Sequence, residues 1–320
     1  MTGDEQEIAR SHGADVVRHR ARRLREREVL FLESGFGAHR DGPLFLSGVI
    51  VAHWPVPVKP SPVTPVPAAT LVLLRDRSRG AYEVLLIRRH RARKFAAGDF
   101  VFPGGMIEPG DGADDAAARC RGVDASHAAR ALDLPAAPQA ALAHWVGVIR
   151  ETFEEVGILL AAAADGGPAR IDGRRLADYR RACQADHRAF GDMLRAERLV
   201  LATDGLVYFA HWITPEIQPL RFDTRFFAAA MPAAQEAVAD EQEITEVRWL
   251  APREALDAHA GGELPLRNPT VKNLELFDGA PSTAAALERM RGRQVRTILP
   301  RVIMEGDERR VLLPGDPGYF

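Results

Sequence analysis

The segment of residues 150–158, Arg-Glu-Thr-Phe-Glu-Glu-Val-Gly-Ile, constrains this chain more than any other. In a helix, Glu151, Glu154 and Glu155 stand at i, i+3 and i+4, so their carboxylates gather on one face. Such like charges repel one another, and only Arg150 stands near enough to offset them. Two interpretations are open. Either the carboxylates bind a hard divalent cation such as Mg²⁺ or Mn²⁺, or they form a solvated acidic patch, because Glu is a good helix former.

A second motif lies upstream, in residues 102–111, Phe-Pro-Gly-Gly-Met-Ile-Glu-Pro-Gly-Asp. A glycine pair lets the backbone turn tightly and approach a bound group closely. Together the two motifs resemble the Nudix box, the signature of hydrolases that split a nucleoside diphosphate linked to another group. The family pattern is Gly, five residues, Glu, seven residues, then Arg-Glu-apolar-X-Glu-Glu-X-Gly-apolar. Residues 150–158 match every specified position of its second half.

The chain departs from this pattern at two places. Asp111 stands where the family usually has Glu, and 38 residues, 112–149, precede Arg150 where the pattern has seven. A box split in this way resembles the branch of the peroxisomal coenzyme A diphosphatase of animals. Residues 209–215, 221–227 and 312–316 are also similar to that branch, so the resemblance covers about residues 68–316.

The resemblance implies the roles of the site residues. The catalytic group would be Arg150, Glu151, Glu154 and Glu155, and the ligands of Mg²⁺ or Mn²⁺ would be the three glutamates and the carbonyl oxygen of Gly105. Arg150 would orient one of the acids, and Glu151 would act as a ligand or as the base. Asp111 is one methylene shorter than Glu, so we expect it to reach the metal through water or not at all. Three further acids before a late strand are alternative candidates for the base: Asp240, Glu241 and Glu243.

A run of basic residues follows the second predicted strand. It contains Arg88, Arg89, Arg91, Arg93 and Lys94. Because guanidinium groups bind phosphate through two parallel hydrogen bonds, the functional interpretation is a clamp for the substrate. The alternative is a solvated basic loop.

The order of predicted strands and helices indicates an α/β (α+β) fold with a mixed sheet between helical layers, and the resemblance implies a Nudix-like α/β/α sandwich. A hairpin is expected from strands 69–75 and 82–88. Apolar residues at 142, 145, 149 and 153 predict a helix from 138 to 156 that faces the sheet and ends at Gly157. The remaining expected elements are strands 206–213, 226–231 and 244–250, helices 174–198, 271–277 and 283–291, one helix from 252, and two short strands ending at 313.

Three parts of the chain are expected. Residues 1–67 form an N-terminal extension whose end, with six prolines between positions 55 and 67, is a stiff linker. Residues 68–260 form the Nudix hydrolase domain, with insertions at about 112–142 and 165–200. Residues 261–320 form a C-terminal extension packed on that domain.

Composition limits the partners. Forty-two basic and 44 acidic residues give a net charge of −2, which argues against a protein that coats nucleic acid. The two cysteines form no CxxC motif, so a reducing compartment is expected. No secretory signal or apolar run long enough to span a bilayer is visible, so we expect a cytoplasmic protein without a membrane partner. The expected partner is a small-molecule nucleotide of the coenzyme A type, and a homodimer is an open alternative.

Motifs for other chemistries are missing: the sequence has no GxSxG, no phosphate-binding Gly-Lys-Ser/Thr loop and no HExxH. His144 and His211 are more simply structural, and Trp212 and the pair Phe226-Phe227 either pack in the core or stack on an adenine. The leading prediction is hydrolysis of coenzyme A or acyl-coenzyme A to adenosine 3′,5′-bisphosphate and (acyl-)phosphopantetheine. The alternatives are another nucleoside diphosphate derivative (NADH, ADP-ribose, a dinucleoside polyphosphate or an RNA cap) and a sensor that binds a nucleotide without cleaving it.

Overall fold

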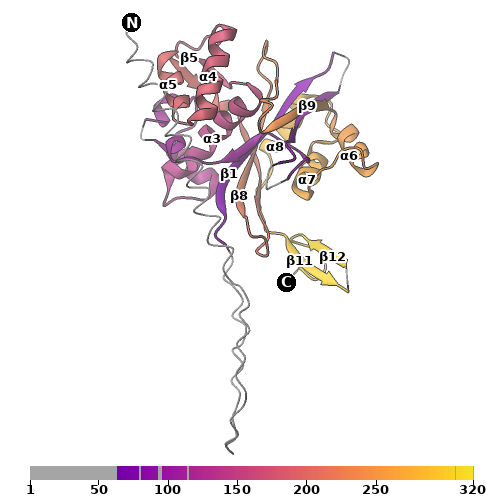
Figure 1. Cartoon of the computed structure of the whole chain (residues 1–320). Coiled ribbons are helices and arrows are strands. Elements are labelled where there is room, and N and C mark those ends of the chain that lie inside the picture. Colours follow the sequence, from indigo (N-terminus) through magenta and orange to yellow (C-terminus); the bar gives the residue numbers. More distant parts are fainter. Residues whose placement is uncertain (1–62, 79–80, 93–95, 114, 307, 320) are drawn as a thin grey trace, which may run out of the picture. The chain divides into compact units, whose positions relative to one another are not determined.

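The computed structural model describes residues 63–78, 81–92, 96–113, 115–306 and 308–319 (Figure 1). Most of the expected N-terminal extension, residues 1–62, lies outside the described residues, as do Arg93 and Lys94 of the basic run. The three-part domain division therefore stays a prediction. None of the described helices is long and apolar enough to cross a membrane.

A mixed sheet of eight strands forms the centre of the described part of the chain. Its middle is the predicted hairpin of β1 (Val66–Asp76) and β2 (Tyr82–Arg89), which pair antiparallel. On its other side β1 runs parallel to β8 (Phe222–Ala230), and the strand order is β10-β7-β8-β1-β2-β3, with β4 on β1 and β9 on β2. The other strands are β3 (Phe100–Val101), β4 (Gly104–Met106), β7 (Val207–Ile213), β9 (Ile244–Leu250) and β10 (Thr297–Ile298).

Helices cover both faces of the sheet, as predicted (Figure 1). Successive side chains of a strand point to opposite faces, so Leu71 and Leu73 of β1 join one apolar cluster and Val72 and Leu74 join the other. The first cluster contains residues of α2 (Ala125–Leu132), α3 (Pro138–Val156), α4 (Gly173–Ala185) and α5 (Ala189–Ala196). The second contains residues of α6 (Pro252–Ala260), α7 (Asn268–Phe277) and α8 (Thr283–Arg291).

Helix α3 carries the acidic motif and has the predicted bounds. Pro138 occupies its first turn, where a missing N–H costs nothing. Trp145 packs edge-on against Phe227 of β8, with ring centroids 4.8 Å apart. Gly157 ends the helix with φ of +74°, a left-handed conformation that favours glycine, and its N–H donates to the carbonyl of Phe153. The apolar stripe therefore fixes how the glutamates are turned.

Two elements differ most from the prediction. Strand β8 begins at Phe222 rather than at 226, because it pairs with β1 along residues 222–230 and the pairing extends the strand beyond its apolar run. The expected helix 174–198 is instead two helices, α4 and α5. They are separated at Asp186, whose backbone is extended and whose carboxylate accepts the N–H of Arg188, so a side-chain hydrogen bond replaces the helical one.

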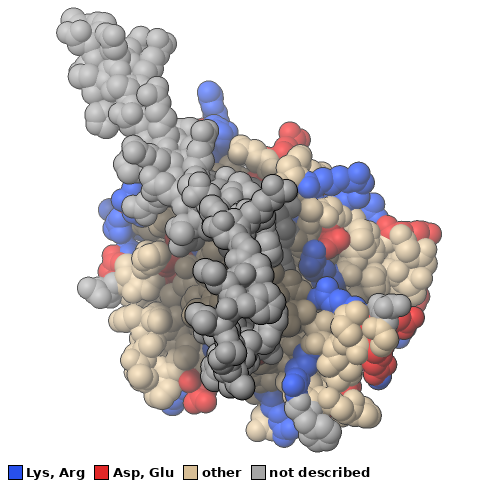
Figure 2. Space-filling model, turned by 60° about the horizontal axis from the view of Figure 1, so that its bottom comes forward, with Lys and Arg blue, Asp and Glu red and all other residues tan. Residues whose placement is uncertain are grey.

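Smaller elements complete the described chain. Strands β5 (Ala161–Ala163) and β6 (Leu199–Leu201) form one two-stranded sheet, and β11 (Arg301–Glu305) and β12 (Glu308–Leu312) form another. Three short 3-10 helices are η1 (Pro109–Gly112), η2 (Ala117–Arg119) and η3 (Thr203–Gly205). On the face shown in Figure 2, basic and acidic side chains are interspersed.

Candidate active site

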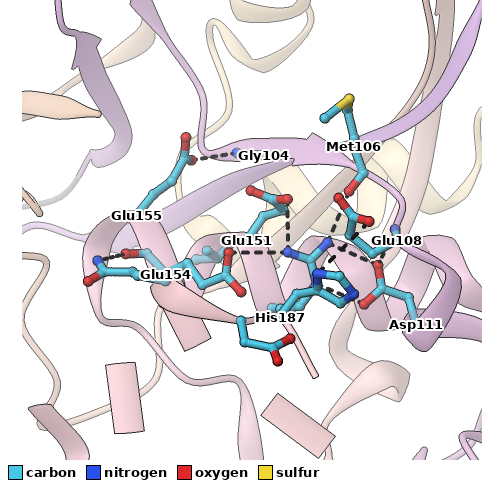
Figure 3. A network of polar contacts seen from close by, with 12 residues as sticks. Gly104, Met106, Glu108, Asp111, Glu151, Glu154, Glu155 and His187 are labelled. Carbon is cyan, nitrogen blue, oxygen red and sulfur yellow. Dashed lines mark hydrogen bonds and ion pairs between the residues drawn. The ribbon is translucent and has the colours of Figure 1, made fainter. Parts of the chain in front are cut away.

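The glycine turn and the acidic helix meet in space although 38 residues separate Asp111 from Arg150 (Figure 3). The N–H of Gly104 donates to Oε2 of Glu155 over 2.8 Å. At Gly105, a Cβ atom would lie 2.5 Å from the carboxylate of Glu151, closer than real Cβ contacts come. Any larger residue at this position would therefore displace Glu151, and glycine is what lets strand β4 lie against the acids.

Arg150 is the centre of the polar network. Its side chain is 2% exposed, and Nε and Nη2 donate to the two carboxylate oxygens of Asp111 over 2.8 and 3.0 Å. Nη2 also donates to the carbonyl of Met106, and Nη1 donates to Glu151 over 2.9 Å and to Glu154 over 3.2 Å. Arg150 thus holds three acids in place, more than the single one expected.

Asp111 is a buried anchor for Arg150. Besides the two bonds from Arg150, its Oδ2 accepts the N–H of Glu108 over 2.8 Å. On α3, a Cβ at Gly147 would lie 2.7 Å from the same Oδ2, so the carboxylate packs directly against the backbone of the helix. The close fit gives a physical reason for Asp at this position, since the extra methylene of Glu has little room.

The three glutamates carry more negative charge than their surroundings offset. Burial raises the pKa of Glu154 to about 8, although the positive charge of Arg150 opposes the shift. Burial also raises the pKa of Glu151 and that of Glu155, and at Glu155 repulsion from Glu151 adds to the effect. Arg89 lies 3.8 Å from Glu155 and offsets its charge only in part. The site favours either protons or an added cation.

The donor chemistry fits a hard divalent cation, but the side chains are not arranged as a finished metal site. Oε1 of Glu154 is buried and has no hydrogen-bond partner among the described residues, which suits a ligand oxygen. Yet no three His, Cys, Asp or Glu side chains of the described part converge as metal ligands. Arg150 holds Glu151 and Glu154, and the Gly104 amide holds Glu155, so their carboxylates would have to turn to share a cation.

Two side chains of the basic run, those of Arg88 and Arg89, lie on different sides of strand β2. Arg89 points to Glu155, whereas Arg88, its neighbour in β2, lies over the ring of Phe100 and pairs with Glu246 at 3.4 Å. Adjacent residues of a strand face opposite sides, so only one of the two can reach the acids. Arg91 is exposed and lies against Gly98.

The late acids also differ from one another. Asp240 accepts the backbone N–H groups of Gln242, Glu243 and Ile244, so it closes the turn before β9. Glu243 lies close enough for its charge to raise the pKa of Glu151 and of Glu155. Glu241 is exposed, and its φ is +63°.

The other singled-out side chains have structural surroundings. His144 is buried with its Nδ1 2.9 Å from the carbonyl of Ala140, and burial lowers its pKa. His211 lies between Asp223, at 2.5 Å, and Thr297, at 2.8 Å. Phe226 and Phe227 belong to the two apolar clusters on opposite faces of the sheet. Core packing therefore accounts for both rings.

Two residues of α4 were missed by the sequence analysis. Arg180 donates to the carbonyls of Glu154 and Glu155 over 3.0 and 2.7 Å and to that of Val238 over 2.9 Å. Gln184 donates to the carbonyl of Glu154 over 2.8 Å. The carbonyls of Glu154 and Glu155 belong to the last turn of α3, where carbonyls have no partner inside the helix. No local signal marks the two residues, because their partners lie 25 to 58 positions away.

A cavity of about 500 Å³ lies beside the network, between η1 and α5. Residues of both expected insertions line it. The lining includes Asp111, Arg119, Val146, His187, Phe190 and Arg195. His187 lies 4.0 Å from Glu108.

Comparisons with known proteins agree with this geometry. The family model described as the NUDT19 Nudix domain matches residues 62–276. The protein named acyl-coenzyme A diphosphatase NUDT19 of Xenopus laevis is 27% identical over 218 residues, which cover 59% of this chain and 57% of that protein. Its human counterpart is 24% identical over 311 residues, which cover 85% of this chain and 79% of that protein.

The matches to the Xenopus and chicken proteins span less than two thirds of the length of those relatives, 57% and 59%. Among solved structures, a NUDIX hydrolase from Alicyclobacillus acidocaldarius superimposes with a TM-score of 0.59 at 28% identity, covering 71% of this chain and 96% of the other. The predicted fold class is therefore confirmed.

Proposed function

Because the chain belongs to the Nudix family, in the branch of the NUDT19 Nudix domain, we propose that it hydrolyses the diphosphate of coenzyme A or acyl-coenzyme A with the help of Mg²⁺ or Mn²⁺. The products would be adenosine 3′,5′-bisphosphate and (acyl-)phosphopantetheine. The observation that carries the proposal is the contact of Gly104 and Gly105 with Glu155 and Glu151. The names of the relatives support the substrate class.

The glutamates would hold the cation, which when bound supplies Lewis acidity and lowers the pKa of a coordinated water. Glu154 would offer its unpartnered Oε1, with Glu151, Glu155 and the Gly105 carbonyl as the other proposed ligands. Because Arg150 donates to both Glu151 and Glu154, its positive charge would offset the repulsion between their carboxylates. Glu151 or Glu243 would take the proton from the attacking water.

Arg89 is the member of the basic run for which a phosphate contact is best supported. It already lies 3.8 Å from Glu155, and its Nε is buried without a hydrogen-bond partner among the described residues. An anionic phosphate oxygen would satisfy that donor. Arg88, Arg91, Arg93 and Lys94 stay predicted contacts.

The free thiols of Cys120 and Cys183 support a reducing compartment, and we propose the cytoplasm.

A substrate panel tests the proposal. The purified chain is incubated with excess Mn²⁺ and coenzyme A, an acyl-coenzyme A, dephospho-coenzyme A, NADH, ADP-ribose or a diadenosine polyphosphate, and products are separated by chromatography. We expect adenosine 3′,5′-bisphosphate from coenzyme A, and a kcat/KM at least tenfold above that of the non-coenzyme A substrates. Faster turnover of any of those substrates would overturn the substrate assignment.

The same assay separates an enzyme from a sensor. The Glu154→Gln variant should lose turnover while binding of coenzyme A, measured by calorimetry, changes little. A wild-type chain that binds coenzyme A and cleaves none of the panel would favour the sensor.

A further inference from the structure

A second cavity lies on the face of the sheet opposite α3 and the glutamates. Its volume is about 210 Å³, and β7, α7, the segment 293–296 and β10 surround it. Figure 1 shows α7 and α8 on the side of the sheet away from α3. Apart from Val295, the apolar residues of its lining belong to the second apolar cluster, whereas α3 packs on the first. The cavity is therefore separate from the candidate active site.

Two residues that line this cavity carry hydrogen-bond donors without a partner. Nε1 of Trp212 and Nδ2 of Asn273 are buried and bond to no atom among the described residues. An unsatisfied buried donor is destabilising, so native proteins rarely keep one without a ligand or an ordered water. Both groups can only donate, and both would be satisfied by an oxygen acceptor.

The lining of the cavity carries more positive than negative charge, with three basic residues and one acidic residue, Glu275. Arg293 and Arg296 line it, and their guanidinium groups make no ion pair or hydrogen bond with the described residues. Lys272, which also lines it, is already paired with Glu275 over 2.9 Å. Two unpaired guanidinium groups line the same cavity as the two residues with unpaired N–H donors, which favours an anion, because arginine binds carboxylates through two parallel hydrogen bonds.

The floor of the cavity is apolar. Phe209 and Ile298 line it together with Leu276 and Leu313. A volume of 210 Å³ corresponds to roughly seven water molecules at about 30 Å³ each, which is room for a body of several carbon atoms. Inorganic phosphate would leave these walls unfilled, whereas a short organic acid would cover them.

We propose that this cavity is a binding site for a small organic carboxylate with an apolar body. The carboxylate accepts from the indole N–H of Trp212 and the amide of Asn273 and pairs with Arg293 and Arg296, while its carbon atoms contact Phe209 and Leu276. Ligand sites of this kind combine apolar walls with a few convergent polar groups. The segments 209–215 and 312–316 of the sequence both contribute to it.

Isothermal titration calorimetry on the full chain tests the site with 4-methylpentanoate and benzoate as probes. At constant ionic strength we expect saturable binding with 1:1 stoichiometry for at least one of the two acids. The neutral analogue 4-methylpentan-1-ol and inorganic phosphate should each bind at least tenfold more weakly. No saturable binding of either acid, or equal binding of the alcohol, would refute a carboxylate site.

Variants locate the binding. The double variant Arg293→Gln/Arg296→Gln changes exposed side chains only, so its Tm should match that of the wild type while its affinity falls at least tenfold. Arg174→Gln, an exposed arginine of α4 on the other side of the sheet, is the matched control and should bind like the wild type.

A third variant examines the buried donors. Asn273→Leu keeps the side-chain volume and removes the unpaired amide, so binding should weaken at least tenfold in protein that remains folded by circular dichroism. Unchanged affinity in the double variant, or an equal loss in Arg174→Gln, would overturn the assignment even if the Asn273 variant failed to fold.

Discussion

Arg180 of α4 connects the second insertion to the last turn of the acidic helix, and its removal tests whether that turn depends on it. Its guanidinium group donates to the carbonyls of Glu154, Glu155 and Val238. The change Arg180→Ala removes all three bonds at once. Arg181→Ala is the matched control, because Arg181 is the next residue of the same helix, is exposed and pairs only with Asp178 among the described residues.

The expected magnitude follows from what replaces each bond. The carbonyl of Glu154 keeps its bond from Gln184, and that of Val238 takes water because the contact is exposed. The carbonyl of Glu155 is left half-buried without a donor, which costs about 1–3 kcal/mol. Burial lowers the pKa of Arg180, so removing the charge recovers part of that cost. We expect the free energy of unfolding to fall by about 1–3 kcal/mol.

Urea unfolding measures the stability change, and the Mn²⁺ concentration that gives half-maximal stabilisation in a thermal melt measures the effect on the glutamates. Fraying of the last turn moves Glu154 and Glu155, so we expect the Mn²⁺ requirement of Arg180→Ala to rise at least fivefold. Arg181→Ala should change neither quantity. If the two variants behave alike, the contact of α4 with the end of α3 has no part in holding the acids.

Three further predictions concern the network around Arg150. Asp111→Ala leaves a buried guanidinium without its two-bond partner, so the free energy of unfolding should fall by about 3–5 kcal/mol; a loss below 1 kcal/mol in urea titration would be inconsistent with this pairing. Gly147→Ala places a Cβ 2.7 Å from Oδ2 of Asp111 and should cost about 1–3 kcal/mol, whereas Gly191→Ala on α5, where the nearest atom is a flexible guanidinium 3.7 Å away, should cost nothing. The pKa of Glu154 is raised from 4.5 to about 8, so its protonated form contributes stability that is present at low pH and lost as the pH rises through about 8; Glu154→Gln should therefore gain on the wild type between pH 5 and 9 in metal-free buffer, and a constant difference in Tm would contradict the assignment.

The sequence contained enough to predict the elements that apolar periodicity specifies. Helix α3 has its predicted bounds because its buried stripe repeats at helical spacing and Gly157 supplies the left-handed end. The contact of the glycine turn with the acids was predictable for a different reason, since the motif as a whole resembles a known family. The insertion between the two halves of the motif forms α2 and short 3-10 helices, and the glycine turn still contacts the acids.

Side-chain contacts between residues far apart in the chain could not be predicted from the sequence. Arg180 lies in a charged segment and has no motif of its own. Its contact with the end of α3 depends on how α4 packs. Strand alternation, by contrast, could have separated Arg88 from Arg89, because neighbours in a strand face opposite sides. The break between α4 and α5 at Asp186 could also have been predicted, because an Asp side chain often accepts a hydrogen bond from the backbone N–H two residues on.

Binding of Mn²⁺ to the metal-free chain, followed by electron paramagnetic resonance, tests the central claim most directly. The wild type should reduce the signal of free Mn²⁺ in a saturable manner, at pH 8 more strongly than at pH 6, because the pKa of Glu154 is raised to about 8. Glu154→Gln should weaken this binding at least tenfold, and Glu275→Gln, an exposed glutamate of α7, should leave it unchanged. Equal binding by the two variants would mean that the buried glutamates hold no cation.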